Sequence, residues 1–287
     1  MLSLYLPIIF ALFAVSSAAI LIKLCDAPAL TIAAYRIVIS SSVLLLWHLA
    51  KKKVPWGGTS AKDIRISILS GFFLAIHFSA WIGSLKLTSV TNSTVLVSTS
   101  PFWVVIAARL LFKTPIKRSL FFSFLIAFTG VVMMTMLSQE NTASTDSFTG
   151  DMWALVGAWG AAGYILCGRF VRKRTENLQY ITIAYSTAGI ILFFMAVIFQ
   201  QQLTGFDREV YGLLALIALV PQLIGHSTFN WALKYLSAPL VSTLMLGEPI
   251  FASLLAWIFL NETHSLLQMS GGILVIAGVA GAIWSEK

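Results

Sequence analysis

One stretch of this chain occurs twice, in two similar versions. Residues 81–101 read WIGSLKLTSVTNSTVLVSTSP, and residues 230–249 read NWALKYLSAPLVSTLMLGEP. A shift of 148 residues, applied without a gap, lays identical residues of the two halves onto each other. Because Lys, Pro and Gly keep identical spacings, the pattern indicates an internal duplication. The matching pairs are Lys86 with Lys234, Ser89 with Ser237, Leu96 with Leu244, Pro101 with Pro249, Ala108 with Ala256, Gly130 with Gly278 and Val131 with Val279.

The composition around these stretches is typical of a membrane protein. The 287 residues are 58% hydrophobic and 10% charged, with a mean hydropathy of +0.88. A soluble domain cannot bury so much apolar surface. A helix needs about 20 apolar residues to cross a bilayer, whereas membrane barrel strands alternate over about 10 residues. Ten continuously apolar windows predict a helical bundle: Leu4 to Lys23, Ala29 to Ala50, Ile64 to Leu87, Asn92 to Phe112, Arg118 to Leu137, Asp151 to Arg169, Leu178 to Gln201, Glu209 to Leu233, Ala238 to Leu260 and Leu266 to Ser285.

The ten windows divide into two halves of five. We expect a first five-helix repeat at residues 1–137, an outside linker at residues 138–150 and a second five-helix repeat at residues 151–287. Because each half has an odd number of helices, the second half enters the membrane upside down. The predicted fold class is an all-α integral membrane protein of ten transmembrane helices, arranged as two inverted repeats around a central cavity. We expect helices 1, 3, 4, 6, 8 and 9 to form this cavity.

Basic residues are concentrated in alternate loops. Short cytoplasmic loops retain Lys and Arg, so the N-terminus is placed inside, which leaves only Lys23, Lys86 and Arg208 outside. We therefore expect a multi-pass protein of the plasma membrane, namely a bacterial cytoplasmic (inner) membrane, with both termini cytoplasmic. The net charge of +8 is then explained by basic loops that lie against the anionic headgroups of the cytoplasmic leaflet. No nucleic acid partner is expected. The inner basic residues are Lys51, Lys52, Lys53, Lys62, Arg65, Lys113, Lys117, Arg118, Arg169, Arg172, Lys173, Arg174, Lys234 and Lys287.

The two quoted stretches, together with FLNE at residues 259–262, resemble the EamA-type branch of the drug/metabolite transporter superfamily. The resemblance implies ten helices in two inverted halves, both termini cytoplasmic, and secondary transport or export of amino acids, related metabolites or drugs. The chain departs from the family pattern in one place. Lys113 and Thr114 stand where the second half has Asn261 and Glu262, the acidic ending that members often show in both halves.

Glu248 is the only carboxylate well inside a predicted span, and it immediately precedes Pro249. An ionisable group in hydrocarbon needs a partner, a water-filled cavity or an interface. Because proline removes a backbone donor and loosens the preceding turn, a carboxylate beside it is a candidate for proton or cation coupling. The alternative is that Glu248 accepts hydrogen bonds from a neighbouring helix and fixes the bend. Pro101 occupies the equivalent place in the first half, so we expect helix kinks at both prolines.

Several polar and aromatic residues inside the windows are candidate substrate contacts. His77 and Trp81 are four residues apart, as are His226 and Asn230, so each pair lies on one helix face. Such faces are suited to bind a carboxylate or to stack on a ring, with ordinary interhelical hydrogen bonding as the alternative. Arg36 lies about 10 Å inside its helix and is a candidate anion contact, unless it snorkels to the interface. The other expected substrate contacts are Asn92, Ser98, Trp159 and Tyr164.

The motifs also exclude several kinds of protein. An ATP-driven pump needs a GxxxxGK[ST] loop, which the sequence lacks, as it also lacks HExxH. Two histidines without a clustered third ligand fall short of a zinc site, so neither a metal nor a cofactor is expected. We therefore expect a secondary carrier of a small solute, proton-linked or facilitative, rather than an enzyme. The alternatives are a channel, a lipid-moving protein and an intramembrane enzyme.

Overall fold

The chain forms a helical bundle of membrane-spanning helices. The computed structural model describes residues 2–88, 90–113, 117–135, 147–260 and 265–285. Within these ranges nine helices are long and apolar enough to cross a membrane, and Arg118–Met134 forms a shorter apolar helix. The predicted all-helical membrane protein of ten spans is confirmed for the described residues.

The first five spans are built from six helices and the second five from nine helical segments. The first half contains α1 (Leu2–Leu24), α2 (Ala29–Ala50), α3 (Ala61–Leu87), α4 (Val90–Val97), α5 (Ser100–Phe112) and α6 (Arg118–Thr135). The second half contains α7 (Ser147–Arg172), α8 (Asn177–Ile198), α9 (Arg208–Ile217), the π-helix η1 (Ala218–His226), α10 (Ser227–Ala232), α11 (Ala238–Leu244), the 3-10 turn η2 (Met245–Gly247), α12 (Glu248–Leu260) and α13 (Leu266–Ser285).

Most observed helices begin within a few residues of the predicted windows. Helix α7 is an exception, because it begins at Ser147 and not at Asp151. The last residues of the expected linker 138–150 are therefore helical, and residues 138–146 lie outside the described part of the chain. Helix α3 begins at Ala61, three residues before the predicted window, because Ser60 caps it: the Ser60 Oγ accepts a hydrogen bond of 3.1 Å from the Asp63 N–H.

The fourth and ninth spans are interrupted at corresponding places. Helix α4 ends at Val97 and α5 begins at Ser100, while the turn η2 separates α11 from α12. Pro101 and Pro249 each stand in the first turn of the helix that follows the interruption. A proline is tolerated there because the first backbone N–H groups of a helix have no partner within it. The eighth span widens into the π-helix η1, which contains Pro221, whereas its counterpart α3 is continuous.

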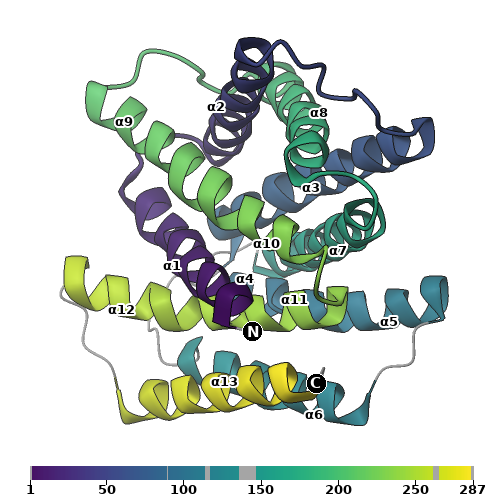
Figure 1. The fold of residues 1–287 in the computed structure, drawn as a ribbon. Coiled ribbons are helices and arrows are strands. Elements are labelled where there is room, and N and C mark those ends of the chain that lie inside the picture. Colours follow the sequence, from purple (N-terminus) through teal and green to yellow (C-terminus); the bar gives the residue numbers. More distant parts are fainter. Residues whose placement is uncertain (1, 89, 114–116, 136–146, 261–264, 286–287) are drawn as a thin grey trace.

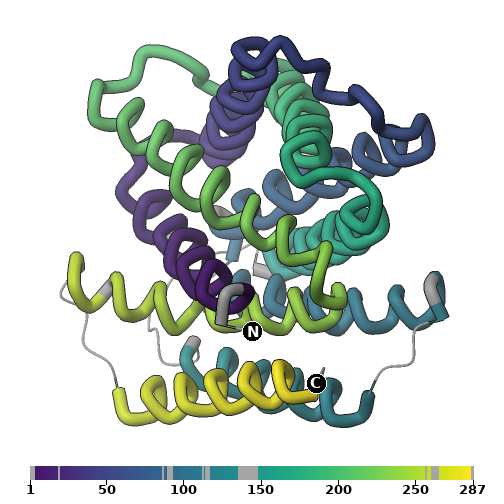
Figure 2. The backbone as a smooth tube through the Cα atoms, viewed as in Figure 1, coloured from purple at the N-terminus to yellow at the C-terminus, as the bar shows by residue number. Residues whose placement is uncertain are grey.

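Contacts between helices of the two halves occur in equivalent pairs, in which each helix is replaced by its counterpart from the other half. Helix α3 packs on α7, and α1 packs on η1 in the equivalent way. Helix α1 contacts α12, as α4 and α5 contact α7. Helices α2 and α6 pack against their own counterparts, α8 and α13, and α5 packs on α11, which is the counterpart of α4. Helices α6 and α13 lie together at one edge, α5, α11 and α12 form the next layer, and the remaining helices cover its other side (Figure 1, Figure 2).

Glycines allow several of these helices to touch at their backbones. A Cβ on Gly130 would lie 2.5 Å from the Gly271 carbonyl oxygen, and one on Gly271 would lie 2.7 Å from the Gly130 oxygen. A Cβ on Gly160 of α7 would lie 2.7 Å from the backbone nitrogen of His77 in α3. Small residues have this role in membrane proteins, where close van der Waals packing drives helix association.

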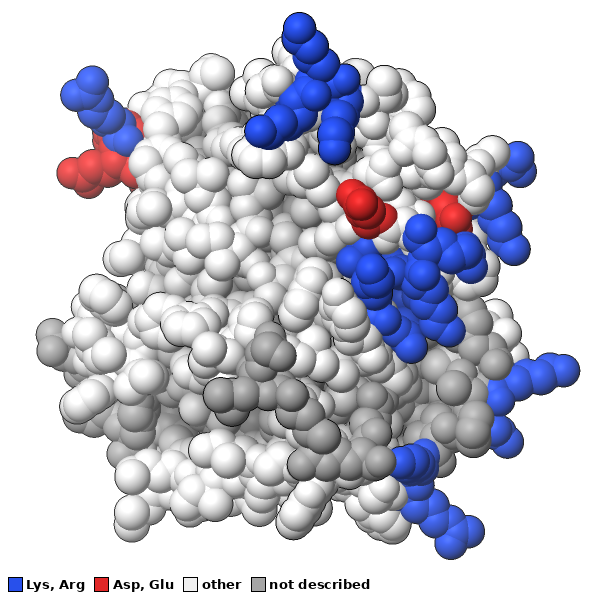
Figure 3. All heavy atoms as spheres, in the orientation of Figure 1, with Lys and Arg blue, Asp and Glu red and all other residues white. Residues whose placement is uncertain are grey.

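Exposed basic side chains gather at one end of the bundle. Most of these basic side chains belong to the connections that follow the even-numbered spans, or to the helix ends beside those connections. We call this end of the bundle the basic face. In Figure 3 these blue side chains lie at the top and along the right, and the lower left surface is white. Arg208 and Lys23 are the exposed basic residues described at the opposite end. The basic face consists of Lys51, Lys52, Lys53, Lys62, Arg65, Lys113, Lys117, Arg118, Lys173, Arg174 and Lys234.

Candidate functional site

Arg36 is buried inside α2 at a contact between the two halves. Its side chain is only 1% exposed. The Nε donates a 2.8 Å hydrogen bond to Oε1 of Gln222 in η1. The guanidinium carbon lies 4.2 Å from the ring centroid of Phe78 in α3, a distance that suits a cation–π contact. The Nη1 and Nη2 groups have no hydrogen-bond partner among the described residues. Arg36 is therefore held on one edge and one face, with two donors left open.

The π-helix brings Gln222 to Arg36. Pro221 has no N–H to donate and lies inside η1, where the turn is wider than in an α-helix. Ser40 of α2 holds the two helices together, because its hydroxyl lies 2.6 Å from the Arg36 carbonyl oxygen and 2.9 Å from that of Ala218. Wide π turns are frequent at functional sites. The Nε2 of Gln222 is itself buried without a partner among the described residues.

A chain of buried hydroxyl and amide groups continues from this contact. The Nδ2 of Asn230 donates to the hydroxyl of Tyr164 and, at 2.8 Å, to the carbonyl oxygen of His226. The Tyr185 hydroxyl lies 3.4 Å from the same Nδ2 and 3.3 Å from the Ser227 Oγ. These residues come from α7, α8, η1 and α10. The polar network thus joins the sixth, seventh and eighth spans next to Arg36.

The two histidines both contact Phe78. His226 meets the Phe78 ring edge-to-face at 5.6 Å, and the His77 ring lies 4.8 Å from it. His77 Nδ1 lies 2.9 Å from the Gly157 carbonyl oxygen, so Nδ1 carries the proton that it donates there. His77 also stacks on Trp81, with ring centroids 5.9 Å apart and planes within 4°. Within the described part of the chain, no three His, Cys, Asp or Glu side chains gather as a metal site would require.

Glu248 begins α12, directly after the interruption of the ninth span. Its backbone oxygen accepts a 2.8 Å hydrogen bond from Ser16 Oγ of α1. Its carboxylate makes no hydrogen bond or ion pair with a described residue, and it interacts electrostatically with Arg36. A carboxylate at the first residue of a helix is stabilised by the helix dipole. Opposite charges attract over several ångströms in an environment of low dielectric constant. Arg36 and an ionised Glu248 therefore carry opposite charges that attract each other.

A second group of candidates lies beside the interruption of the fourth span. The Trp159 side chain is 49% exposed and meets Trp103 edge-to-face at 5.4 Å. Trp103 Nε1 donates a 3.2 Å hydrogen bond to Thr99 Oγ1. Half-buried Ser98 stands between α4 and α5. Asn92 belongs to α4 by its backbone, but its side chain lies outside the described part of the structure. Trp159 thus contacts the fourth span through Trp103, which belongs to the helix that follows the interruption.

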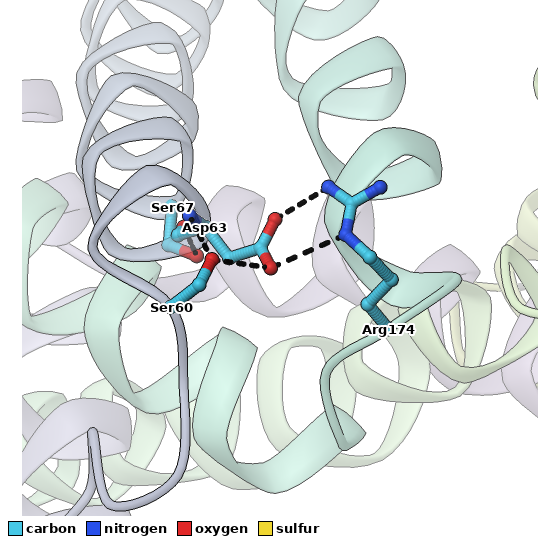
Figure 4. Close-up of polar contacts among 4 residues, drawn as sticks. All are labelled: Ser60, Asp63, Ser67 and Arg174. Atoms are coloured by element: carbon cyan, nitrogen blue, oxygen red, sulfur yellow. Dashed lines mark hydrogen bonds and ion pairs between the residues drawn. The ribbon is translucent and has the colours of Figure 1, made fainter.

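An ion pair joins the two halves at the basic face (Figure 4). Arg174 Nη2 lies 2.6 Å from Asp63 Oδ1, and Ser60 Oγ donates to Asp63 Oδ2 at 2.8 Å. The Asp63 carboxylate raises the pKa of Arg174 by accepting its hydrogen bonds. Arg172, two residues earlier, donates from Nε to the Asn230 carbonyl oxygen at 3.1 Å. The end of α7 and the residues that follow it therefore hold α10 and α3 at this end of the bundle.

Comparison with known proteins places this architecture in a family. Residues 2–136 and 148–284 each match the model of the EamA-like transporter family. The chain belongs to this family. An EamA-like transporter is a multi-pass membrane protein and not an enzyme, and the double match agrees with the duplicated sequence. The Arg36 cluster lies where helices of the two EamA repeats meet.

Relatives of this EamA-like transporter cover most of its length. An uncharacterized transporter of Archaeoglobus fulgidus is 25% identical over 251 residues, which are 86% of this chain and 85% of that one. The uncharacterized transporter YdfC of Bacillus subtilis is 23% identical, covering 86% and 79%. The pseudopaline exporter CntI of Pseudomonas aeruginosa is 22% identical, covering 79% and 78%. A crystal structure with 15% identity superimposes with a TM-score of 0.82 over 99% of both chains, which shows a shared fold.

The sequence did not identify three residues of the site. Phe78, Gln222 and Tyr185 form its centre with Arg36, yet none was a candidate. Gln222 follows Pro221 inside an apolar window, and the same rule that selected Glu248 beside Pro249 would have found it. Phe78 and Tyr185 carry no comparable signal, because aromatic residues are common in membrane helices.

Proposed function

We propose that this EamA-like transporter is a secondary carrier that moves a small metabolite across the membrane by alternating access. Amino acids, related solutes and drugs are the candidate substrates, and transport is proton-linked or facilitative. The observation that supports this most strongly is the buried cluster of Arg36, Gln222, His226 and Asn230. Polar groups inside a membrane bundle are expensive to bury, and they mark substrate or ion pathways.

The paired helix contacts support the alternating-access mechanism. Inverted repeats give one bundle two related ways to close, each sealing a different face of the membrane. In this structure α3 packs on α7 more extensively than α1 packs on η1. Exchange of these two arrangements would open the opposite face while the site between the repeats stays in place. A rigid channel has no need of such an exchange.

Substrate contacts are proposed on helices of both repeats. His77 and Trp81 come from the third span, Tyr164 from the sixth, and His226 and Asn230 from the eighth. Asn92, Ser98 and Trp159 extend the proposed site toward the fourth span. The interruptions at Pro101 and Pro249 give the fourth and ninth spans points at which they can bend. Aromatic and polar groups together suit a solute with an apolar body and a polar end.

Glu248 is the proposed coupling residue. Its carboxylate has no described hydrogen-bond partner and interacts electrostatically with Arg36. A carboxylate in this position can exchange a proton when a substrate charge enters or leaves. Facilitative transport, with Glu248 as a purely structural residue, is the alternative.

The orientation follows from the basic face. Lys and Arg remain on the cytoplasmic side of short loops, so we place the basic face and both termini in the cytoplasm. The plasma membrane, as a bacterial cytoplasmic membrane, is the proposed location. The name of the Pseudomonas relative supports export as one mode of transport in this family.

Counterflow in proteoliposomes tests the proposed function. Vesicles containing the purified protein are loaded with an unlabelled solute, and uptake of the same labelled solute is followed for amino acids, nucleosides and amphipathic drugs. A carrier should give saturable uptake that an internal load accelerates. Uptake that neither saturates nor responds to the load would indicate a channel, and movement of labelled lipid between leaflets would indicate a lipid-moving protein.

A further inference from the structure

The geometry of the Arg36 guanidinium leaves a planar pair of donors open. Gln222 Oε1 occupies the Nε edge at 2.8 Å, and the Phe78 ring covers one face at 4.2 Å. Nη1 and Nη2 are both buried and without a hydrogen-bond partner in the described part of the chain. Two contacts thus fix the plane and the direction of the guanidinium. The remaining edge is a fixed fork of N–H donors.

The other buried arginine of the bundle provides a contrast. Arg172 is 2% exposed, and its Nε and Nη1 donate to the carbonyl oxygens of Asn230 and Thr175. A buried donor without a partner costs about 1–3 kcal/mol, and more when it belongs to a charged group. In Arg172 this cost is avoided because backbone carbonyl oxygens accept its hydrogen bonds. In Arg36 the cost remains, because Nη1 and Nη2 have no acceptor among the described residues. A ligand that supplies acceptor oxygens would remove it.

We propose that Arg36 is the receptor for a carboxylate group of the substrate, with Gln222 and Phe78 as positioning residues. The proposal rests on the proposed carrier function and names the chemical class of its substrate. A carboxylate offers two oxygens in one plane, which match the two open nitrogens of the fork. Arginine binds carboxylates in this bidentate way, whereas lysine presents a single point charge.

The charges around Arg36 favour a single carboxylate over a dianion such as a phosphate ester. The groups that interact with Arg36 electrostatically are Glu248, His77, His226, Tyr164 and Tyr185. Glu248 is the acidic group among them, so a second negative charge on the ligand would be repelled. The carboxylate is carried either by a zwitterion, whose ammonium group satisfies Glu248, or by a simple organic acid, whose binding requires a proton on Glu248. Both share the contact with Arg36.

Ligand-dependent thermal stability of the purified full chain in detergent tests the proposal. Each probe acid is compared with its own amide: L-phenylalanine with L-phenylalaninamide, L-leucine with L-leucinamide, and phenylpropionate with phenylpropionamide. A ligand that binds the folded state raises Tm in a saturable way. At least one acid should stabilise the protein with an affinity at least about tenfold higher than that of its amide, because hydrogen bonds to charged groups are lost in the amide. The amino acids and phenylpropionate separate the zwitterion from the simple acid.

Variants connect this preference to Arg36. Arg36→Lys keeps the charge but removes the fork, and the preference for acid over amide should fall several-fold. The exposed Arg109→Lys is the matched control and should keep the wild-type preference. Gln222→Glu retains Arg36 and supplies an internal carboxylate that competes with the ligand for it. The preference for acid over amide should therefore also fall in this variant. It provides the test if Arg36→Lys does not fold.

Three results would overturn the proposal: no acid stabilises the wild type, an amide binds as well as its acid, or Arg36→Lys keeps the preference. The carrier function is tested separately: counterflow of a neutral or cationic solute would still support a carrier even if one of these three results were obtained. Conversely, a clear preference for acids without counterflow of any of them would count against the carrier and leave the carboxylate receptor in place.

Discussion

The Nε of Arg36 and the Oε1 of Gln222 form a 2.8 Å hydrogen bond that crosses from the first repeat to the second. Both side chains are almost fully buried, at 1% and 0% exposure. Arg36 stands on a regular helix, whereas Gln222 stands on a π-helix that contains a proline. An irregular segment of one repeat thus meets a buried arginine of the other.

Gln222→Met should weaken transport by removing the acceptor that orients Arg36. The methionine keeps the volume of the side chain, so the fold should persist, but the guanidinium loses one of its two anchors. A hydrogen bond to a charged group is worth about 1.5–3 kcal/mol, so KM should rise about tenfold or more. Gln200→Met, at an exposed position, is the control in the same counterflow assay and should behave as wild type. An unchanged KM in Gln222→Met would show that Gln222 does not position Arg36 for binding.

Glu248→Gln should abolish proton-linked uptake and spare expression. The amide keeps the shape of the side chain but cannot exchange a proton, so an imposed pH gradient should no longer drive accumulation in proteoliposomes. Counterflow, which needs no net proton movement, should continue. The exposed Glu209→Gln is the matched control and should retain the response to the gradient. The same pH dependence in Glu248→Gln as in wild type would assign Glu248 a structural role at the start of α12.

Gly271→Leu should destabilise the protein by separating α6 from α13. The carbonyl oxygen of Gly130 would lie 2.7 Å from the new Cβ, and the leucine finds no space between the helices. Overpacking of this kind costs about 1–3 kcal/mol. Thermal unfolding in detergent, followed by fluorescence, measures the change. Gly212→Ala is the control, because nothing lies within 4 Å of its Cβ, and there Tm should stay the same or rise slightly. Equal effects of the two substitutions would mean that α6 and α13 do not pack this closely.

Asp63→Asn should weaken the closure of the basic face. The Asp63 side chain is 5% exposed and that of Arg174 is 48% exposed, so solvent screens the pair in part. We expect a loss of about 1 kcal/mol or less. The difference from wild type should shrink as salt is added, because salt screens exposed charges. Asp207→Asn, whose side chain is exposed and caps no helix through a hydrogen bond, is the control in the thermal unfolding assay. A loss that added salt leaves unchanged would contradict an electrostatic origin.

The sequence predicts the helical fold well, and the reason is physical. A span must be apolar over about 20 residues, so its presence can be read without knowledge of its neighbours. Hydropathy does not predict where α7 begins. Ser147, Thr149 and Asp151 are polar and turn-forming, yet they are helical, and Gly150 among them packs against Thr88 of the first repeat. Contacts between distant segments decide such boundaries.

The site is predicted in part. Arg36, Tyr164, His226, Asn230 and Glu248 stand out as polar or ionisable groups in apolar windows, and the structure brings them to one place or into electrostatic range. Phe78 becomes important only because three other side chains meet its ring. That convergence depends on how helices cross, which no single-window pattern contains.

The most direct test of the central claim, alternating access around the Arg36 cluster, measures distances at both ends of the bundle. One pair of spin labels replaces exposed Lys62 and Lys234 at the basic face, and a second pair replaces exposed Leu24 and Glu209 at the opposite end, after Cys25 and Cys167 are changed to alanine. Pulsed dipolar spectroscopy is recorded in nanodiscs with and without a solute that shows counterflow. Alternating access predicts opposite changes, with one distance distribution shortening as the other lengthens. Distances that stay fixed at both ends, or that change in the same direction, would contradict it.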